Sequence, residues 1–397
     1  MCQIKRTIKN LLKMNDNSRW YFALKYSIFS IPFYLFRILP IDKKKVVVTS
    51  FKGRYGGDPR YIAEELRRTA SSIDLVYLLD HTEACWDGGI RRIRYGSIRA
   101  VYELVTAKVW IDDCRKEGYV RKRKGQFYIG TGHGGIPMKK IEKDAEDKLT
   151  AAYLMLARND SDMTDLKPSN SRWRTAMLRR AFWYTGEILN CGLPSVERLI
   201  KDRAETKKRI RQEYHLGDGS RLFLYAPTFR NTTAGRLYDL DYQEIVKAFE
   251  KRFGGSWVGI RRLHPNVRNY DRIEIPGNVI DATDYPDMVD LLLASDSLLT
   301  DYSSCIFDTL FLDIPAFIYA TDLKEYTEKE RGLYWNINEL PFPVATIKEE
   351  LVKNIMEYDP ERYAAGIVSL KTELGLFDDQ MHATETLVNR IVAEMDK

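Results

Sequence analysis

The sequence predicts an α/β fold with two Rossmann-like domains. Short apolar, often β-branched runs alternate with helical stretches along the chain, and polar residues gather directly after these runs. Gly192 and Pro194 punctuate the middle of the chain before a strongly charged helical stretch, which indicates a crossover between two domains. The chain has 397 residues, of which 44% are hydrophobic, so it can form two cores of ordinary size.

The domain bounds follow from these signals. We expect a terminal segment over residues 1–42, an N-terminal domain over 43–187, a C-terminal domain over 188–370 and a C-terminal helix over 371–397. For that last helix, a return to the N-terminal domain is one option.

Charge and cysteine usage limit the class of partner. The formal net charge of +6 is modest, but lysine and arginine are clustered, which favours a local anionic partner such as a phosphorylated substrate or an acidic membrane surface over nucleic acid. The five cysteines are scattered singly, without a CxxC pair. This pattern indicates a reduced, cytosolic protein with neither a zinc cluster nor a disulfide framework.

Residues 1–42 differ in composition from the rest of the chain. A basic start is followed by the aromatic and aliphatic run 20–39, whose length is close to that of a bilayer span. Lys25, Pro32 and Arg37 interrupt the run and no small-residue cleavage site follows it, so a segment lying in the membrane interface fits better than a spanning helix. The alternative is a helix packed on the protein's own core.

The N-terminal domain is expected to begin with a strand over 46–50, a glycine-rich loop over 51–60 and a helix over 61–68. The loop lacks the dinucleotide fingerprint and the Walker lysine pattern, so it is a weak candidate for phosphate binding. Four further apolar runs continue the alternation and are expected to be buried strands of a parallel sheet: 73–79, 108–112, 127–130 and 152–156.

A histidine lies between glycines directly after the expected strand 127–130. The glycines are Gly132, Gly134 and Gly135. They leave His133 little side-chain packing, which favours a catalytic or binding role over a structural one. Two interpretations are open for Lys139 and Lys140, which follow on the next turn: steering of an anionic substrate, or a solvated face.

The C-terminal half repeats the alternation after a charged helical stretch over 196–213. Its apolar runs are expected to be strands, and they lie at 222–230, 257–265, 279–282 and 288–294. His264 stands beside Arg261 at the end of one such strand. Because ligands bind outside the carboxyl ends of strands in open α/β sheets, and because this pair would otherwise need carboxylate partners, we expect it to face an anion.

The stretch 298–308 has the pattern of a buried strand that runs into a helix. Thr300 ends the apolar run, Ser303 and Ser304 suit a helix N-cap, and apolar residues at helical spacing follow. Such a turn presents free backbone N–H groups, which favour a phosphate. The alternative is a turn that only caps the helix.

Taken together, these motifs resemble those of the CDP-glycerol glycerophosphotransferases of the teichoic-acid (TagB/TagF) type. The resemblance runs from about residue 45 to near the C-terminus, and its motifs are His133-Gly134 with Pro137 and Lys139-Lys140, Gly192-x-Pro194, Tyr225-Ala-Pro-Thr-Phe-Arg230, Leu263-His-Pro265, Thr300-Asp-Tyr-Ser-Ser304 with Phe307-Asp308, and Arg331-Gly-Leu-Tyr334. Two departures, Gly132 and Gly135 around the His-Gly pair and Ser-Val-Glu after Pro194, bear on the acceptor more than on the chemistry.

The resemblance implies a GT-B architecture, in which two Rossmann-like domains face each other across a cleft and the C-terminal one holds the nucleotide. It also implies a lipid-linked acceptor and peripheral association with the anionic cytoplasmic face of a bacterial cell membrane, which makes the run 20–39 a better candidate for an anchor. CDP-glycerol is the implied donor. No tightly bound cofactor is implied, and a divalent cation is left open because no carboxylate cluster accompanies the motifs.

The implied reaction is attack of an acceptor hydroxyl on the β-phosphate of CDP-glycerol, with release of CMP. His133 is the implied general base, and His264 would contact the transferring phosphate or assist the leaving CMP. The remaining donor-side residues are Arg230, Arg261, Thr300, Asp301, Ser303, Ser304 and Arg331, of which Asp301 is expected to orient the turn. Gly134, Lys139 and Lys140 are assigned to the acceptor or to anion steering.

Three alternatives stay open at this stage. They are a CDP-ribitol-dependent transferase, a nucleotide-sugar glycosyltransferase or epimerase on the same fold, and a catalytically inert membrane-bound polymer-binding protein. The sequence does not distinguish a primase from a polymerase or wall teichoic acid from a capsule polymer, and it leaves the oligomeric state unknown.

Overall fold

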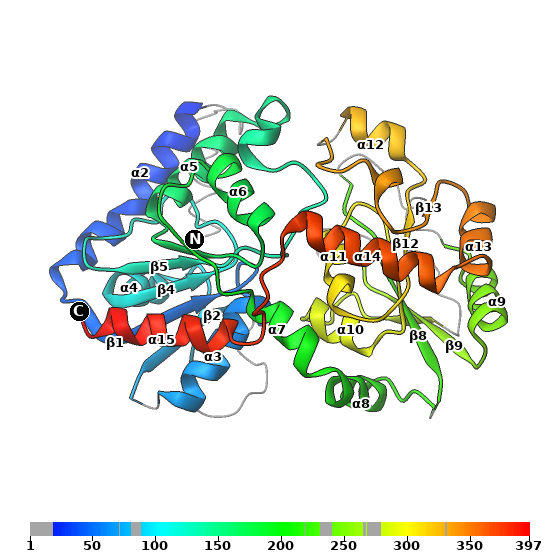
Figure 1. Ribbon diagram of the computed structural model, residues 1–397. Coiled ribbons are helices and arrows are strands. Elements are labelled where there is room, and N and C mark those ends of the chain that lie inside the picture. The colour runs from blue at the N-terminus through cyan, green and yellow to red at the C-terminus, as the bar shows by residue number, and fades with distance from the viewer. Residues whose placement is uncertain are drawn as a thin grey trace. The chain divides into compact units, whose positions relative to one another are not determined.

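The computed structural model describes residues 19–70, 72–80, 89–217, 219–230, 240–264, 267, 279–329 and 332–397, with the backbone alone for 19–25 and 329. The chain divides into two compact units (Figure 1). The first takes in the chain up to His133, together with Glu142–Pro194 and Phe377–Lys397. The second takes in Gly134–Ile141 and Ser195–Leu376.

The first unit is built on a seven-stranded sheet in the order β3-β2-β1-β4-β5-β6-β7, in which every strand pair is parallel. The strands are β1 Asp42–Thr49, β2 Asp74–Leu79, β3 Arg91–Arg94, β4 Ala107–Asp112, β5 Phe127–Gly130, β6 Leu166–Pro168 and β7 Glu187–Leu189. The central strands β1 and β4 carry runs of fully buried apolar residues, because helices cover both faces of a parallel sheet.

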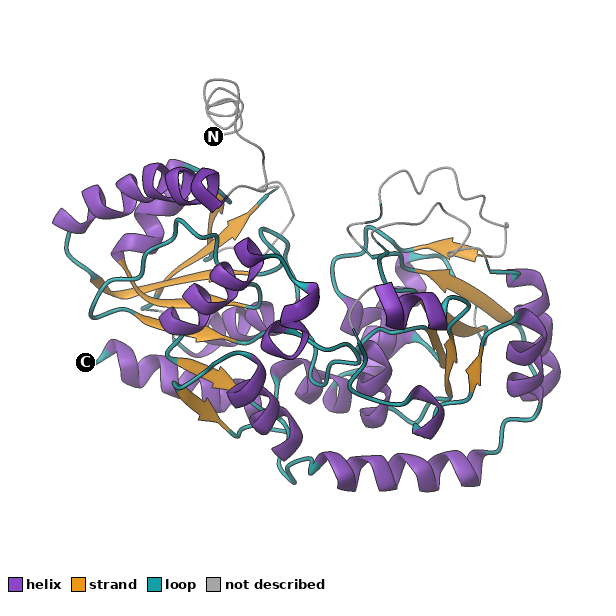
Figure 2. Cartoon of the chain, turned by 90° about the horizontal axis from the view of Figure 1, so that it is seen from above, coloured by secondary structure: helices purple, strands orange, loops and turns teal. Residues whose placement is uncertain are grey.

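Two apolar clusters fill the two faces of this sheet. Helices cover both of these faces (Figure 2). The helices of the unit are α2 Arg19–Leu35, η1 Phe36–Ile38, α3 Gly57–Thr69, α4 Ile98–Thr106, η2 Glu142–Lys148, α5 Ala151–Met163, α6 Arg172–Ala181 and α15 Ala383–Met395. On one face, α3 packs beside α15, whose Leu387 and Ile391 are fully buried in the cluster. On the other face, α2 and α4 pack around Trp110 and Tyr128.

The second unit contains a six-stranded sheet in the order β10-β9-β8-β11-β12-β13, again with parallel pairs. Its strands are β8 Arg221–Ala226, β9 Trp257–Arg261, β10 Val279–Asp281, β11 Ser297–Thr300, β12 Ala316–Tyr319 and β13 Val344–Ala345. Its helices are α8 Arg203–Glu213, α9 Tyr242–Phe253, α10 Met288–Ala294, α11 Cys305–Asp308, η5 Thr309–Phe311, α12 Leu323–Lys329, η6 Ile337–Glu339, α13 Lys348–Met356 and α14 Pro360–Leu374, and α7 Pro194–Lys201 connects the units along the chain.

Two of the expected strands are helices. Residues 152–156 lie inside α5 and 288–294 form α10. Both runs are short and apolar, and such runs do not distinguish a buried strand from a buried helical segment. The residues before them decide the outcome, since the Thr150 hydroxyl accepts a hydrogen bond from the amide of Tyr153 and the Asp287 carboxylate accepts one from the amide of Val289.

Helix α2 packs one face on its own domain and exposes the other. Phe33, only 1% exposed, lies in the cluster around Trp110. The solvent side of α2 and of the following η1 presents an apolar stripe of Ile31, Tyr34, Leu35 and Ile38, with Leu35 63% and Ile38 89% exposed. Among the described residues, no helix combines the length and hydrophobicity needed to cross a bilayer. Residues 1–18 of the expected membrane segment lie outside the described residues.

Candidate active site

The turn that carries His133 begins where β5 ends. The amide of Thr131 donates to the carbonyl of Asp112 at 2.9 Å, which pins this turn to the end of the neighbouring strand β4. The carbonyl of Thr131 in turn accepts a hydrogen bond from Nη2 of the buried Arg174 at 2.9 Å. Gly132 and Gly134 have φ of +69° and +82°, a conformation that favours glycine and explains the glycines on both sides of the histidine.

His133 is exposed to solvent, and its imidazole contacts neighbouring groups of the first unit. Its Nδ1 lies 3.1 Å from the carbonyl oxygen of Asp113 and 3.9 Å from Sγ of Cys114, and the ring of Phe51 packs on it with 5.4 Å between ring centroids. A carbonyl oxygen only accepts hydrogen bonds, so the neutral imidazole carries its proton on Nδ1. The lone pair then resides on Nε2, as a general base requires.

Asp113, at the end of β4, ties the His133 turn to the loop that follows β1. Its Oδ2 accepts a hydrogen bond from the Ser50 hydroxyl at 2.5 Å, and its Oδ1 accepts one from the Phe51 amide at 2.8 Å. Burial, together with the charge of Asp112, raises the pKa of Asp113 to about 8. Sequence reasoning missed Asp113 and Phe51, although two consecutive aspartates directly after a strand are a detectable signal.

The chain directly after His133 belongs to the second unit. Along Gly134–Ile141, the carbonyl of Met138 accepts from the amide of Tyr334 at 3.0 Å, the amide of Lys140 donates to the carbonyl of Gly332 at 2.8 Å, and Lys139 forms an antiparallel bridge with Leu333. These contacts place Lys139 and Lys140 beside the Gly-Leu-Tyr motif. Arg331, the predicted phosphate ligand before that motif, lies outside the described residues.

The Thr300–Asp308 turn is held by Asp301. Its Oδ1 accepts hydrogen bonds from the amides of Thr228 and Tyr302 at 2.8 and 2.5 Å. Thr300 is fully buried and its hydroxyl donates to the carbonyl of Ala226 at 2.6 Å, so it joins β11 to β8 and is not placed to meet a phosphate.

The helix after this turn is shorter than the sequence indicated. Helix α11 is a single turn over Cys305–Asp308 and continues as the 3₁₀ helix η5. The expected N-cap is corrected as well: Ser304 has helical φ and ψ and makes no capping hydrogen bond, while the Ser303 hydroxyl accepts a long one, 3.4 Å, from the amide of Cys305. Both serines are half-buried, and a Cβ on Gly134 would lie 2.8 Å from the Ser304 hydroxyl.

The guanidinium group of Arg230 forms ion pairs with two carboxylates. Its Nη2 lies 2.8 Å from Asp301, its Nε lies 2.8 Å from Asp322, and its guanidinium packs on the stacked rings of Tyr302 and Tyr326. Burial alone would raise the pKa of Asp322, but the hydrogen bonds and charge of Arg230 hold that pKa below its ordinary value. The geometry gives Arg230 a structural position, which corrects the expectation that it adds charge at the phosphate.

Arg261 and His264 differ in their surroundings. Arg261 is 1% exposed and pairs with Asp281 at 2.7 Å, so it has the carboxylate partner that the sequence argument named as the alternative to facing an anion. His264 is exposed at the carboxyl end of β9, with its ring 5.9 Å from that of Phe229. His264 therefore stays a candidate for facing an anion, whereas Arg261 is buried and paired with Asp281.

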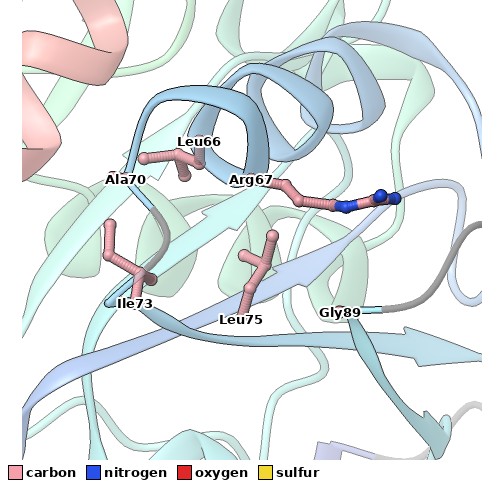
Figure 3. A pocket seen from close by; sticks show the side chains of 6 residues that line it. All are labelled: Leu66, Arg67, Ala70, Ile73, Leu75 and Gly89. Carbon is pink, nitrogen blue, oxygen red and sulfur yellow. The ribbon is translucent and has the colours of Figure 1, made fainter.

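A small cavity of about 210 Å³ lies elsewhere in the first unit (Figure 3). It is lined by Leu66, Arg67, Ala70, Ile73, Leu75 and Gly89, at the amino end of β2, whereas the predicted site residues follow the carboxyl ends of strands. Within the described part of the chain, no group of histidine, cysteine or acidic side chains is placed to hold a metal ion.

Comparisons with known proteins agree with these motifs. The family model described as CDP-Glycerol:Poly(glycerophosphate) glycerophosphotransferase matches residues 31–393. A teichoic acid poly(glycerol phosphate) polymerase of Staphylococcus epidermidis is 28% identical over 80% of this chain and 46% of that protein, so this chain spans about half of its length. A teichoic acid glycerol-phosphate transferase of Staphylococcus aureus is 27% identical over 90% of this chain and 91% of that protein.

A solved structure shows the same fold. It is a histidine-to-asparagine variant of the wall teichoic acid polymerase TagF soaked with CDPG, and it matches with a TM-score of 0.79 and 24% identity over 95% of this chain and 98% of that chain. The two parallel-sheet α/β units are therefore those of the TagF fold. Because the family model covers nearly the whole chain, the family predicted from the motifs is confirmed: the protein belongs to the CDP-glycerol:poly(glycerophosphate) glycerophosphotransferase family.

Proposed function

We propose that the chain transfers glycerol phosphate from CDP-glycerol to a hydroxyl of a polymer acceptor in teichoic-acid or related surface-polymer synthesis, and releases CMP. The observation that carries the proposal is His133, which is exposed on a glycine-flanked turn with Nδ1 bonded to a backbone carbonyl and the lone pair on Nε2. Membership of the family and the CDPG soaked into TagF support the choice of donor.

In the proposed reaction, Nε2 of His133 takes the proton from the acceptor hydroxyl. The acceptor oxygen forms a bond to the β-phosphorus of CDP-glycerol, and the bond from that phosphorus to the oxygen of CMP breaks. Phosphoryl transfer depends on positioning and charge stabilisation more than on covalent catalysis. Ser303, Ser304 and the exposed His264 are the candidates for holding the donor phosphates, with Arg331 as a further prediction from the motif.

We also propose that the acceptor is lipid-linked and that the chain works at the cytoplasmic face of a bacterial membrane. The support is the exposed apolar stripe Ile31, Tyr34, Leu35 and Ile38 on α2 and η1, since aromatic and aliphatic side chains of this kind lie at lipid interfaces. Three further points stay predictions. They are the arrangement of the two units across a GT-B cleft, a role in capsule synthesis, and the use of a divalent cation.

The membrane proposal is tested with anionic phospholipid vesicles. Leu35→Ser with Ile38→Ser should reduce sedimentation with the vesicles, whereas Val368→Ser, which removes an equally exposed apolar residue from α14, should not. Equal sedimentation of all variants would count against the stripe, and unchanged partition after deletion of residues 1–40 would count against the whole segment.

The donor proposal is tested by the nucleotide that is released. The purified protein is incubated with an acceptor and with CDP-glycerol, CDP-ribitol or a UDP-sugar, and the products are analysed by mass spectrometry. Release of CMP from CDP-glycerol is expected. Release of CMP from CDP-ribitol alone would favour the ribitol transferase, release of UDP would favour a nucleotide-sugar enzyme, and no release would favour a polymer-binding protein.

A further inference from the structure

Asp113 contacts His133 through its main chain and the neighbouring loop through its side chain. The carbonyl oxygen of Asp113 lies 3.1 Å from Nδ1 of His133. Its carboxyl group, on a residue only 4% exposed, accepts the Ser50 hydroxyl and the Phe51 amide. The same residue therefore holds both the histidine and the aromatic ring that packs on the histidine.

The loop that Asp113 holds is in an unfavourable conformation. Phe51 and Lys52 have φ of +41° and +59°, which side chains with a Cβ rarely adopt, and such residues persist only where surrounding contacts enforce them. The hydrogen bond from the Phe51 amide to Asp113 is one enforcing contact. Two amides further along the loop, those of Gly53 and Arg54, donate to the carbonyl of Ser50 at 2.9 and 2.8 Å. This conformation directs the Phe51 ring onto the imidazole.

We propose that Asp113 is a positioning residue for His133: its carboxyl group enforces the Ser50–Lys52 turn that packs on the imidazole, and its carbonyl oxygen keeps the imidazole proton on Nδ1. The proposal rests on the proposed function, in which Nε2 accepts the proton of the acceptor hydroxyl. When that proton arrives, the imidazolium cation still donates from Nδ1 to the Asp113 carbonyl, and this charge-assisted hydrogen bond is stronger than the neutral one.

The carboxyl group of Asp113 accepts both hydrogen bonds, one from the Ser50 hydroxyl and one from the Phe51 amide. In Asp113→Asn the side-chain oxygen can still accept from the Phe51 amide, and the side-chain NH₂ can donate to the Ser50 oxygen, because a hydroxyl also accepts. Asp113→Asn should therefore preserve the turn. Alanine offers neither group, so Asp113→Ala should release the turn and, with it, the Phe51 ring.

The first readout is the tautomer of His133, measured from its imidazole ¹⁵N chemical shifts and assigned by comparison with His133→Ala. Wild type and Asp113→Asn should show the Nδ1–H tautomer. Asp113→Ala retains the backbone carbonyl but releases the Phe51 ring that packs on the imidazole, so the imidazole can turn away from that carbonyl and a mixture of tautomers is expected. An Nε2–H tautomer in wild type, or an unchanged Nδ1–H tautomer in Asp113→Ala, would overturn the proposal. This readout needs no turnover, so it judges the positioning role even if CDP-glycerol is not the donor.

The second readout is the rate of CMP release. Displacement of a reacting group by about 1 Å costs roughly 10²-fold in rate, so kcat of Asp113→Ala should fall by about that factor while KM for CDP-glycerol is unchanged. Asp113→Ala combined with His133→Ala should be no slower than His133→Ala alone, because the first change acts through the second residue. If the double variant were slower than His133→Ala by the same factor that Asp113→Ala loses relative to wild type, the proposal would be contradicted.

Asp160→Ala is the matched control. Asp160 is 5% exposed and, like Asp113, accepts one backbone amide and one hydroxyl, but from Lys116 and Tyr128. The Asp160→Ala substitution should lower the Tm of the protein without changing the tautomer of His133. If Asp113→Ala does not fold, Ser50→Ala removes one of the two donors and should give a smaller shift of the same kind; no shift in that variant would overturn the proposal.

Discussion

Replacing Arg230 with methionine should destabilise the second unit strongly. Arg230 is 7% exposed and lies between the carboxylates of Asp301 and Asp322, so its removal leaves two negative charges without their cation. Breaking a buried ion pair by removing one partner costs about 3–5 kcal/mol. For a unit of this size that corresponds to a fall in Tm of roughly 6–20 °C.

The assay is differential scanning calorimetry of the whole chain, with Lys348→Met as the matched control. Lys348 also pairs with two carboxylates, those of Asp241 and Glu244, but its side chain is 37% exposed, so its loss should change Tm far less. A Tm for Arg230→Met equal to that of the control would refute the structural assignment. Loss of CDP-glycerol binding without loss of stability would restore the original expectation that Arg230 binds phosphate.

Two further predictions concern Asp113 and the serine turn. Burial raises the folded pKa of Asp113 to about 8, so between about pH 4 and about pH 8 the folded state holds a proton that the unfolded state has lost. The free energy of unfolding of wild type should therefore fall by about 1.4 kcal/mol per pH unit relative to that of Asp113→Asn as pH rises through this range. Unfolding midpoints of the two proteins that change in parallel with pH would contradict this prediction. Ser303→Ala with Ser304→Ala should raise Kd for CDP-glycerol at least about tenfold by calorimetry, since hydrogen bonds to charged groups contribute about 1.5–3 kcal/mol; unchanged affinity would count against the phosphate turn.

The sequence predicted the central strands well because their signal is local. In parallel sheets covered on both faces, strands such as β1, β4 and β5 contain uninterrupted buried apolar runs, which lie at 46–48, 109–111 and 127–129. The edge strand β3, Arg91–Arg94, alternates exposed and half-buried residues and gave no such signal. The strands predicted at 152–156 and 288–294 are wrong, because the apolar content of these runs fits a buried helix equally well.

The site was predicted in part for a related reason. His133 could be found because glycines surround it in sequence. The residues that hold it come from the end of β4 and from the loop after β1, and they become neighbours only through the strand order. Likewise, Arg230 looked like a free cation in sequence, because its partner Asp322 lies ninety-two residues away.

The most direct test of the central claim is CMP release from CDP-glycerol by wild type and His133→Ala, measured beside CDP-glycerol binding to both. A positioned general base contributes about 10²–10⁴-fold, so the variant should bind the donor with unchanged affinity and release CMP slower by a factor in that range. Full CMP release by His133→Ala in the presence of acceptor would contradict the account.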